Sequence, residues 1–442
     1  MLKESVITFV SRLITVMLGT ANVIILARFL GPKGQGIFMV IATLVTLLVA
    51  VGSLGIGQAN VYFLGLKRYN IKELFWNSIF ASFIVGVLLI GIALLTYKYL
   101  NPFFKGASYD MVALYALSIP LLLGWGKMNS FLLALQRFTS FNIIIITIGS
   151  LTAVNYIIFL SISPTIKTAI IISIIMNGVG FILTIIYMIK EIGLSIFKPK
   201  GNLKALLDSL KFGIKGHAGS VIDFMNFRID RLLINLLAGP AAVGFYAIAT
   251  TVAEAIWNIS RSIALVLFPK VSNSSDIVSN AQTTAKSCRI SFFSSIIIGI
   301  FLLLTGKWLI PLVFGSAFIA SVPALNFLLP GVIIFSLTHI IISYMVGQGY
   351  PHYNTIIALI SFIFNISLNL WLIPIMGIAG AAIASSVSYT ISTISSIYLY
   401  KKIVKQKSKQ SNKEINISLS DIIIIKQTDW KSIRNIFKQF GI

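Results

Sequence analysis

The sequence is poor in charge. Only 11% of its 442 residues are Asp, Glu, Lys or Arg, whereas 57% are hydrophobic. A soluble domain of ordinary composition has about a quarter of its residues charged. The composition therefore excludes a soluble protein of this size and indicates that most of the surface faces lipid.

Cysteine and histidine are also scarce. Cys288 is the single cysteine, so an internal disulfide and a multi-cysteine metal site are excluded. The histidines His217, His339 and His352 show no spacing typical of metal ligands. We therefore expect no metal and no other cofactor.

Several catalytic motifs are missing. The sequence has no P-loop with Gly-Lys-Ser/Thr, no paired-aspartate sugar-nucleotide motif, no Ser/His/Asp set near a membrane face and no long outer loop. An ATP-driven pump or a membrane glycosyltransferase would normally need one of these features. We therefore expect a protein that is not an enzyme.

What the sequence has instead is long apolar stretches, each close to the roughly 20 residues that a membrane-spanning helix needs. We predict twelve transmembrane helices and an all-α integral membrane fold. The expected spans are 6–29, 37–64, 74–100, 111–135, 141–162, 168–189, 213–238, 242–268, 290–314, 322–346, 353–374 and 376–400.

The net charge of +23 is unevenly distributed. If the N-terminus is inside, most lysines and arginines outside the spans fall on the inner side, including Lys67 and Arg68, the 190–212 linker and the stretch after residue 400. This is the positive-inside bias. It places both termini in the cytoplasm and argues against a nucleic-acid partner.

Short segments recur at a spacing of about 210 residues. "LGPKGQGIFMVIAT" at 30–43 matches "AGPAAVGFYAIATT" at 238–251, and "QRFTSFN" at 136–142 matches "QGYPHYN" at 348–354. Six helices separate the copies, so both copies have the same orientation and a parallel pseudo-two-fold repeat relates two six-helix lobes. We divide the chain into an N-terminal lobe with a basic linker (1–200), a C-terminal lobe (201–403) and a basic amphipathic tail (404–442).

Polar residues inside the spans recur at three- and four-residue intervals, which places them on single helix faces. Ionisable groups in a bilayer usually face a bundle interior or a wet cavity. The candidates for lining a substrate cavity are Arg12, Asn22, Lys127, Arg228, Arg231 and Arg261. The candidates for ion pairs or for coupling to an ion are Asp223, Asp230 and Glu254.

The cationic surplus among these candidates suits an anionic ligand such as a phosphate or pyrophosphate. The alternative is that the charges pair with one another and fix helix packing. Arg12 and Lys127 favour a functional role, because neither has an acidic residue within its own predicted span.

Two basic segments outside the spans are expected on the inner leaflet. The linker 190–212 is basic and partly amphipathic, and lysines from Lys401 to Lys413 attract anionic lipid. Farther along, Trp430, Ile433, Phe437 and Phe440 fall on one face of a predicted interfacial helix that Asp429 would cap.

The chain resembles the Wzx-type oligosaccharide flippases of the multidrug/oligosaccharidyl-lipid/polysaccharide exporter superfamily over about residues 1–400. The resemblance rests on five segments in order, namely "ARFLGPKGQGIF", "DRLLINLLAGPAAVGFYAIA", "LFPKVS", "LIPLVFGSAF" and "NLWLIPIMGIAGAAIASSVSY". It implies two six-helix bundles with alternating access in a bacterial plasma membrane. The implied substrate is an undecaprenyl-pyrophosphate-linked oligosaccharide, for O-antigen, capsule or another glycan, with a polymerase and glycosyltransferases as possible partners.

Two other functions stay open. A cation-coupled drug antiporter of the same superfamily would need an anionic cavity, which the cationic surplus fits poorly. A membrane polysaccharide polymerase or acyltransferase would need a large outer loop with paired Arg or His, which the sequence lacks.

Overall fold

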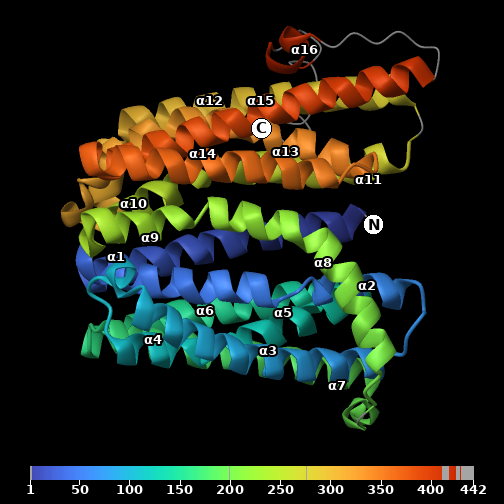
Figure 1. Cartoon of the computed structure of the whole chain (residues 1–442), viewed down its shortest axis with the longest axis horizontal. Coiled ribbons are helices and arrows are strands. Elements are labelled where there is room, and N and C mark those ends of the chain that lie inside the picture. Colours follow the sequence, from blue (N-terminus) through green and yellow to red (C-terminus); the bar gives the residue numbers. More distant parts are fainter. Residues whose placement is uncertain (1, 199, 275, 411–417, 425–428, 430–442) are drawn as a thin grey trace. The chain divides into compact units, whose positions relative to one another are not determined.

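The structure is a computed structural model that describes residues 2–198, 200–274, 276–410, 418–424 and 429. Every regular element in this described part is a helix (Figure 1). The α-helices are α1 (Leu2–Gly52), α2 (Ile56–Gly65), α3 (Ile71–Tyr99), α4 (Tyr109–Ala116), α5 (Ser118–Ala134), α6 (Phe138–Ile162), α7 (Ile166–Ile192), α8 (Leu203–Asn226), α9 (Ile229–Ala238), α10 (Pro240–Glu254), α11 (Trp257–Ser272), α12 (Ile277–Phe314), α13 (Ser321–Gly347), α14 (His352–Met376), α15 (Ile378–Gln410) and α16 (Leu419–Ile423). Three short 3-10 helices join them: η1 (Asn101–Phe104), η2 (Leu194–Phe197) and η3 (Ser316–Phe318).

The chain clusters into two compact units. Unit 1 comprises Met1–Ile248 and Pro311–Phe318, and unit 2 comprises Ala249–Ile310 and Ile319–Ile442. The predicted division at residues 200 and 403 follows the sequence repeat rather than this clustering and stays a prediction.

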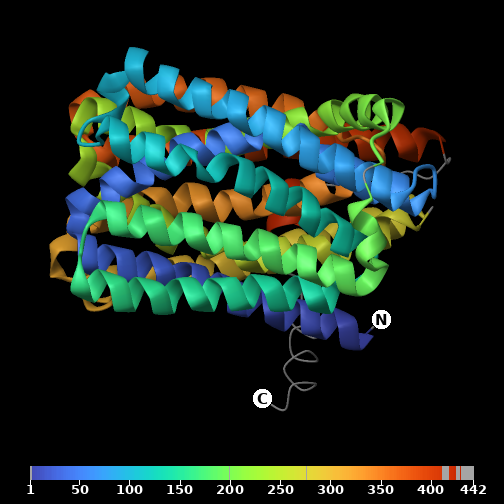
Figure 2. The ribbon, with the colours of Figure 1, turned by 90° about the horizontal axis from the view of Figure 1, so that it is seen from below.

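Unit 1 is built from α1, α3, α5, α6 and α7, which run side by side (Figures 1 and 2). α5 packs against α2, α3 and α7, and α1 packs against α6. Their buried faces carry large apolar side chains such as Ile41, Phe75 and Phe131, while α3 exposes Phe83 and Ile84 on its other side. An outward apolar face of this kind is what a helix in contact with lipid presents.

Unit 2 has its core where α11, α13 and α15 meet. Leu267, Ile340, Tyr344 and Tyr400 are fully or almost fully buried there. Ile422 of α16 belongs to the same cluster, so a segment beyond the last predicted span packs against this core. α15 also continues to Gln410 with no break at residue 404.

The described residues contain nine helices long and apolar enough to cross a membrane, or ten if α10 and α11, bent by 45°, form one span. This establishes a multi-pass membrane protein, but the twelve predicted spans and the two-lobe repeat are not confirmed. The predicted spans 6–29 and 37–64 lie in one run, Ser11–Gly65. The predicted span 213–238 is broken between α8 and α9, where Arg228 and Asp230 make the sequence polar.

The Gly-Pro segments that recur in the sequence have matching backbone conformations in unit 1. Gly31 has φ 63° and ψ −179°, and Gly239 has φ 84° and ψ 175°, in the left-handed region that glycine tolerates best. Gly36 and Gly244 then lie at a close crossing of α1 and α10. A methyl group at Gly36 would overlap the Pro240 carbonyl oxygen, and one at Gly244 would overlap the Pro32 carbonyl oxygen.

The predicted interfacial helix of the tail, with Trp430, Ile433, Phe437 and Phe440, lies outside the described residues. Lys413 lies outside them as well. Asp429 is described, is fully buried and contacts α12.

Candidate anion-binding site in unit 1

The candidate site is centred on Lys127 in the middle of α5. This side chain is 2% exposed, and its Nζ donates to Ser82 Oγ of α3 at 3.2 Å. Among the described residues no Asp or Glu forms an ion pair with it. A buried ammonium without a carboxylate partner is costly, which makes Lys127 a candidate for binding an anion.

Neutral polar groups surround Lys127 on the side of α2 and α3. Asn60 Nδ2 donates to Ser78 Oγ at 3.0 Å and to Ser130 Oγ at 3.3 Å, and Ser130 Oγ donates to the Lys127 carbonyl oxygen at 2.6 Å. Asn60 Oδ1 is buried and accepts no hydrogen bond from the described residues. The network orients Lys127 through hydroxyl and amide groups and leaves its charge uncompensated.

A cavity of about 220 Å³ opens beside Lys127 within unit 1. It is several times larger than the roughly 30 Å³ share of one water molecule. The lining residues are Val49, Ser53, Gly55, Gly57, Gln58, Leu122, Leu123, Gly126, Lys127 and His217. Lys127 and His217 are the titratable members of this lining, and both become cationic on protonation.

His217 faces the cavity from α8, and its position follows from a close helix crossing. Gly213, one turn earlier, lies so close to the α1–α2 junction that a methyl group there would overlap the Leu54 carbonyl oxygen. Gly55 accepts the same crossing with φ 67°. The two glycines therefore let α8 approach until the His217 ring reaches the end of α1.

The hydrogen bonds of His217 indicate its tautomer. His217 Nε2 lies 2.8 Å from the Ala50 carbonyl oxygen and 2.8 Å from Ser53 Oγ. A carbonyl oxygen only accepts, so the proton is assigned to Nε2. Nδ1 then carries a lone pair in the neutral ring and becomes a second donor when the ring is protonated.

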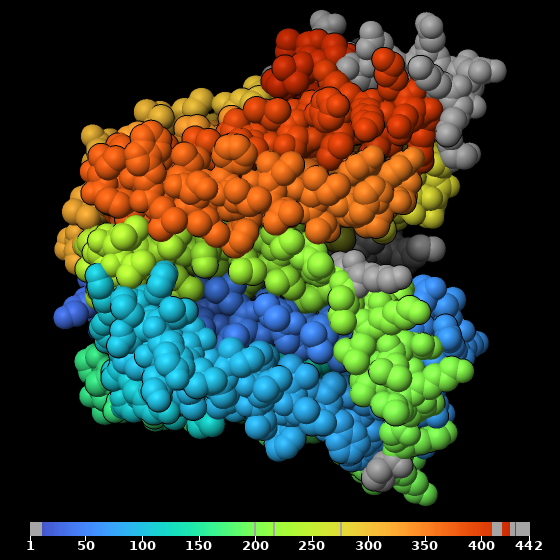
Figure 3. Space-filling model, viewed as in Figure 1, coloured from blue at the N-terminus to red at the C-terminus, as the bar shows by residue number. Residues whose placement is uncertain are grey.

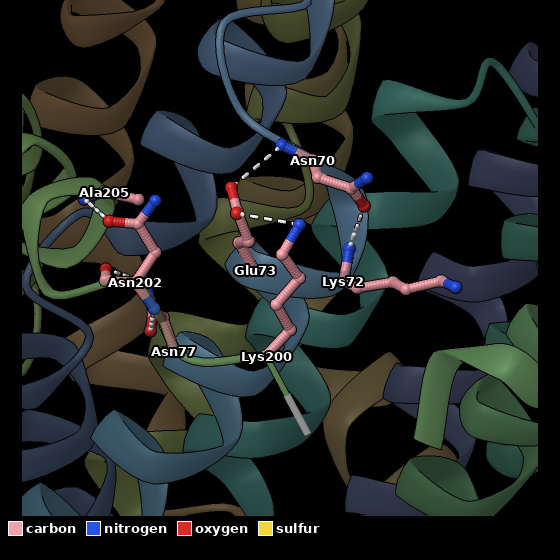
Figure 4. A network of polar contacts seen from close by, with 7 residues as sticks. All are labelled: Asn70, Lys72, Glu73, Asn77, Lys200, Asn202 and Ala205. Atoms are coloured by element: carbon pink, nitrogen blue, oxygen red, sulfur yellow. Dashed lines mark hydrogen bonds and ion pairs between the residues drawn. The ribbon is translucent and has the colours of Figure 1, made fainter. Parts of the chain in front are cut away.

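The start of α8 is anchored to α3, as Figure 4 shows. Asn77 Nδ2 donates to the Asn202 carbonyl oxygen at 2.8 Å, the Asn202 amide donates back to Asn77 Oδ1 at 3.2 Å, and Asn202 Oδ1 caps α8 by accepting from the Ala205 amide. Glu73 Oε1 pairs with Lys200 Nζ at 3.3 Å, while Glu73 Oε2 accepts from the Asn70 amide. These contacts fix the entry of the helix that carries His217.

The predicted cavity residues of α1 are Arg12 and Asn22, and neither lines the cavity beside Lys127. Arg12 is half-buried, and no hydrogen bond or ion pair of the described residues involves its side chain. Asn22 Nδ2 donates to the Gly149 carbonyl oxygen of α6 at 3.3 Å. Asn22 therefore contributes to packing of α1 on α6.

The predicted charged residues of α8 and α9 lie near the break between these helices. Arg228 is at the start of α9, and its Nη1 donates to the Phe227 carbonyl oxygen at 3.0 Å. Asp230 is buried and accepts from the Tyr246 hydroxyl at 2.8 Å. Arg231 and Asp223 are half-buried and have further partners, so this group includes interactions of the kind expected for packing.

The predicted candidates in unit 2 are Arg261 and Glu254, both half-buried. Arg261 Nε donates to His339 Nε2 at 3.1 Å, and its guanidinium lies 5.3 Å from the centre of the Trp257 ring. Both residues have further partners.

Comparison with known proteins decides the family. Residues 25–323 match the polysaccharide biosynthesis protein family. The chain belongs to this family. Over 244 residues it is 26% identical to the probable low-salt glycan biosynthesis flippase Agl15 of Haloferax volcanii, covering 52% of this chain and 49% of that protein. It is 27% identical over 199 residues to the membrane protein MJ1068 of Methanocaldococcus jannaschii, covering 43% and 38%. The chain thus spans about half the length, or less, of the curated relatives it matches.

The fold of this family member is also found in solved transporters. The lipid II flippase MurJ in an inward closed conformation aligns with a TM-score of 0.76 at 16% identity, covering 99% of this chain and 98% of that one. An inward-facing multidrug resistance MATE family transporter of the MOP superfamily aligns with a TM-score of 0.74 at 14% identity, covering 90% and 96%. The predicted family resemblance is confirmed, and these structures establish a MATE-like fold.

In this polysaccharide biosynthesis protein, the sequence named Lys127 as a candidate but not His217, Ser53 or Gln58, which line the same cavity. The three histidines show no common spacing in the sequence. His217 reaches the cavity only because α8 crosses the α1–α2 junction at Gly213 and Gly55. The available signal was local: "GIKGHAGS" at 213–220 places three glycines around one histidine, a composition that favours close helix approach.

Proposed function

We propose that this chain is a flippase for a polyprenyl-pyrophosphate-linked oligosaccharide, moving it from the cytoplasmic to the outer leaflet by alternating access. Its carrier would be undecaprenyl in a bacterial plasma membrane. The observation that carries the proposal is the buried Lys127 beside a cavity whose titratable lining residues are both potential cations. Membership of the polysaccharide biosynthesis protein family and the relationship to a glycan biosynthesis flippase support it.

The chemistry of the pocket suits a phosphate group. The Lys127 ammonium has three donors, of which one is used by Ser82 Oγ and two remain for a phosphate oxygen. Lys127 is already buried before a ligand arrives, so binding requires little further desolvation of its ammonium. Burial also strengthens the attraction between the ammonium and an anion. The apolar carrier would stay in the lipid while the pyrophosphate and sugars pass through the protein.

The remaining charged candidates enter the proposal in secondary roles. Arg12 would extend the cationic path along α1, and Arg228, Arg231 and Arg261 would do so elsewhere. Asp223, Asp230 and Glu254 would pair with these cations or couple transport to an ion. Both termini would be cytoplasmic. Glycosyltransferases would act before the flippase and a polymerase after it.

A translocation assay tests the function. The purified chain is placed in vesicles that contain a polyprenyl-pyrophosphate-linked oligosaccharide, and an added glycosidase reports the fraction of sugar on the outer face. We expect the chain to expose sugar that protein-free vesicles protect, and Lys127→Ala to reduce the rate. Removing one charged hydrogen bond costs about 1.5–3 kcal/mol, or roughly 10- to 150-fold. No translocation by the intact chain would contradict the proposal.

The drug antiporter is the second candidate, because the MATE fold is shared. It predicts an acidic residue in the pocket, whereas the described lining of this cavity contains none. Transport of a lipophilic cation, with no translocation of the lipid-linked glycan, would favour it.

A further inference from the structure

The first half of α8 presents an apolar face that the described chain leaves largely exposed, although Leu210 within it is half-buried. Leu203, Leu207, Leu210 and Ile214 follow one another at intervals of four, three and four residues and so lie on one side of the helix. Leu203 is 71% exposed, Leu207 57% and Ile214 54%. Figure 3 shows this part of α8, in light green, at the surface of unit 1 beside the blue segments.

Lysines border this apolar face. Lys204 and Lys211 are exposed and lie one helical step around from Leu203 and Leu210. Lys198 and Lys200 are exposed just before α8, next to the exposed Leu194 of η2. An exposed apolar stripe flanked by lysines, on a helix too charged here to enter the hydrocarbon core, is the pattern of an interfacial helix on anionic lipid.

The opposite side of the same helix is held to the bundle. Asp208 accepts from Arg68 Nη2 at 2.8 Å and from the Tyr69 hydroxyl at 2.5 Å, and Phe212 stacks on Tyr62 with ring centres 4.4 Å apart. The Trp76 indole also donates to the Ile196 carbonyl oxygen at 3.0 Å. These contacts orient the apolar face outward, at the end of unit 1 where α2 ends and α3 begins.

α8 then continues without a break to His217 in the Lys127 cavity. We infer that the face of Leu203, Leu207, Leu210 and Ile214, with Lys204 and Lys211, is a docking site for an anionic lipid leaflet, and that docking holds His217 against Ala50 and Ser53. α8 connects the apolar face to the Lys127 cavity, and Gly213, at the crossing with the α1–α2 junction, lies between the two. This docking needs no transport activity and is separate from the proposed function.

Spin labels test the docking. Cys288, the single native cysteine, is fully buried, so a label reacts with an introduced cysteine in the full-length chain. Leu207→Cys reports the apolar face, Ile84→Cys on the lipid-facing side of α3 is the buried-in-lipid standard, and Lys67→Cys in the exposed α2–α3 loop is the aqueous standard. Each is measured in phosphatidylcholine vesicles with and without phosphatidylglycerol, using oxygen and a nickel chelate as relaxation agents.

We expect the label at 207 to approach the lipid standard when phosphatidylglycerol is present. Lys204→Gln with Lys211→Gln should lower the ratio of docked to undocked label by about fivefold for each lysine removed, the factor that corresponds to roughly 1 kcal/mol. A label at 207 that stays aqueous in both vesicles would overturn the docking site. Equal depth in both vesicles would overturn the role of the anionic headgroup, and dipolar broadening between labels would show instead that a second copy covers the face.

The link to the cavity has its own measurement. Diethyl pyrocarbonate modifies histidines, and peptide mass spectrometry compares His217 with the exposed His352 in the same molecule. We expect slower modification of His217, relative to His352, in vesicles that contain phosphatidylglycerol, and no such difference in the double lysine variant. An unchanged His217 rate in vesicles where the label does dock would contradict the link.

Discussion

The two units each bury a cation, and they treat it in opposite ways. In unit 2, Arg289 is 6% exposed and forms a bidentate pair with the fully buried Asp429, through Nε to Oδ2 at 2.6 Å and Nη2 to Oδ1 at 3.0 Å. Arg289 Nη1 also donates to the Asp421 carbonyl oxygen. In unit 1, Lys127 is buried even more completely, with a serine hydroxyl as its hydrogen-bond acceptor.

The comparison separates a buried charge that is paired within the protein from one that has no carboxylate partner among the described residues. The Arg289–Asp429 pair satisfies both charges within the protein, so it connects α12 to the end of the chain and leaves nothing for a ligand. The charge of Lys127 is not matched inside the described part of unit 1, and a cavity adjoins it. Burial alone does not identify a binding residue; the proposed role of Lys127 rests on burial without a counter-charge beside open volume.

The largest expected effect on stability comes from breaking the satisfied pair. Arg289→Ala removes the cation that pairs with the buried Asp429 carboxylate, and breaking a buried pair in this way costs about 3–5 kcal/mol. The melting temperature of the purified protein in detergent should fall by several degrees, and Asp429→Ala should cause a similar loss. The exposed Lys270 provides the control, since Lys270→Ala should change stability by less than about 0.5 kcal/mol. Equal, small effects at Arg289 and Lys270 would show that the pair is not part of the unit 2 core.

The next effect concerns the crossing that brings His217 to Lys127. Gly213→Ala places a methyl group against the Leu54 carbonyl oxygen, and overpacking of this kind costs about 1–3 kcal/mol. We expect a lower melting temperature together with faster diethyl pyrocarbonate modification of His217. Gly19→Ala is the matched control, because nothing lies within 4 Å of a methyl group there. If both variants behave alike, α8 does not depend on this crossing.

The smallest effect concerns the Arg68–Asp208 ion pair, which holds α8 to the loop between α2 and α3. The Tyr69 hydroxyl and the Arg68 guanidinium lower the pKa of Asp208 from its ordinary value of 3.8. The stabilisation is therefore present above the ordinary carboxyl pKa and is lost as pH falls through the lowered folded-state pKa. Asp208→Asn should lower the melting temperature slightly at neutral pH and remove this part of the acid dependence. A variant with the same acid dependence as the natural chain would exclude a contribution from Asp208.

Sequence reasoning was successful where the pattern is local. Apolar stretches predicted a membrane-embedded helical protein. The matching Gly-Pro segments contain Gly31 and Gly239, which have similar backbone conformations, but the two-lobe repeat drawn from these segments is not confirmed. Lys127 was named as a candidate because it is a lone cation in an apolar stretch, and its role stays a prediction. Each inference needs only residues close together in the chain.

What escaped prediction depends on contacts between distant residues. His217 joins Lys127 only because α8 crosses the α1–α2 junction at two glycines. Asp429 was expected to cap a helix in a separate tail, whereas it pairs with Arg289 of α12 from 140 positions away. The twelve predicted spans are not confirmed for a related reason, since hydropathy does not distinguish a break within one long helical run from a turn between two spans.

Lys127→Met tests the central claim most directly, since methionine nearly preserves the volume and removes the charge. Melting temperature and translocation of the lipid-linked glycan are measured on the same preparation, with Lys127→Arg as the charge-preserving control. If the charge serves an anionic ligand, Lys127→Met keeps or raises the melting temperature, because it removes the desolvation cost of a buried charge that has no ion-pair partner. Translocation falls at least tenfold, and Lys127→Arg retains more of it. A Lys127→Met protein that translocates at the natural rate, or that loses stability in proportion to its activity, would contradict the account.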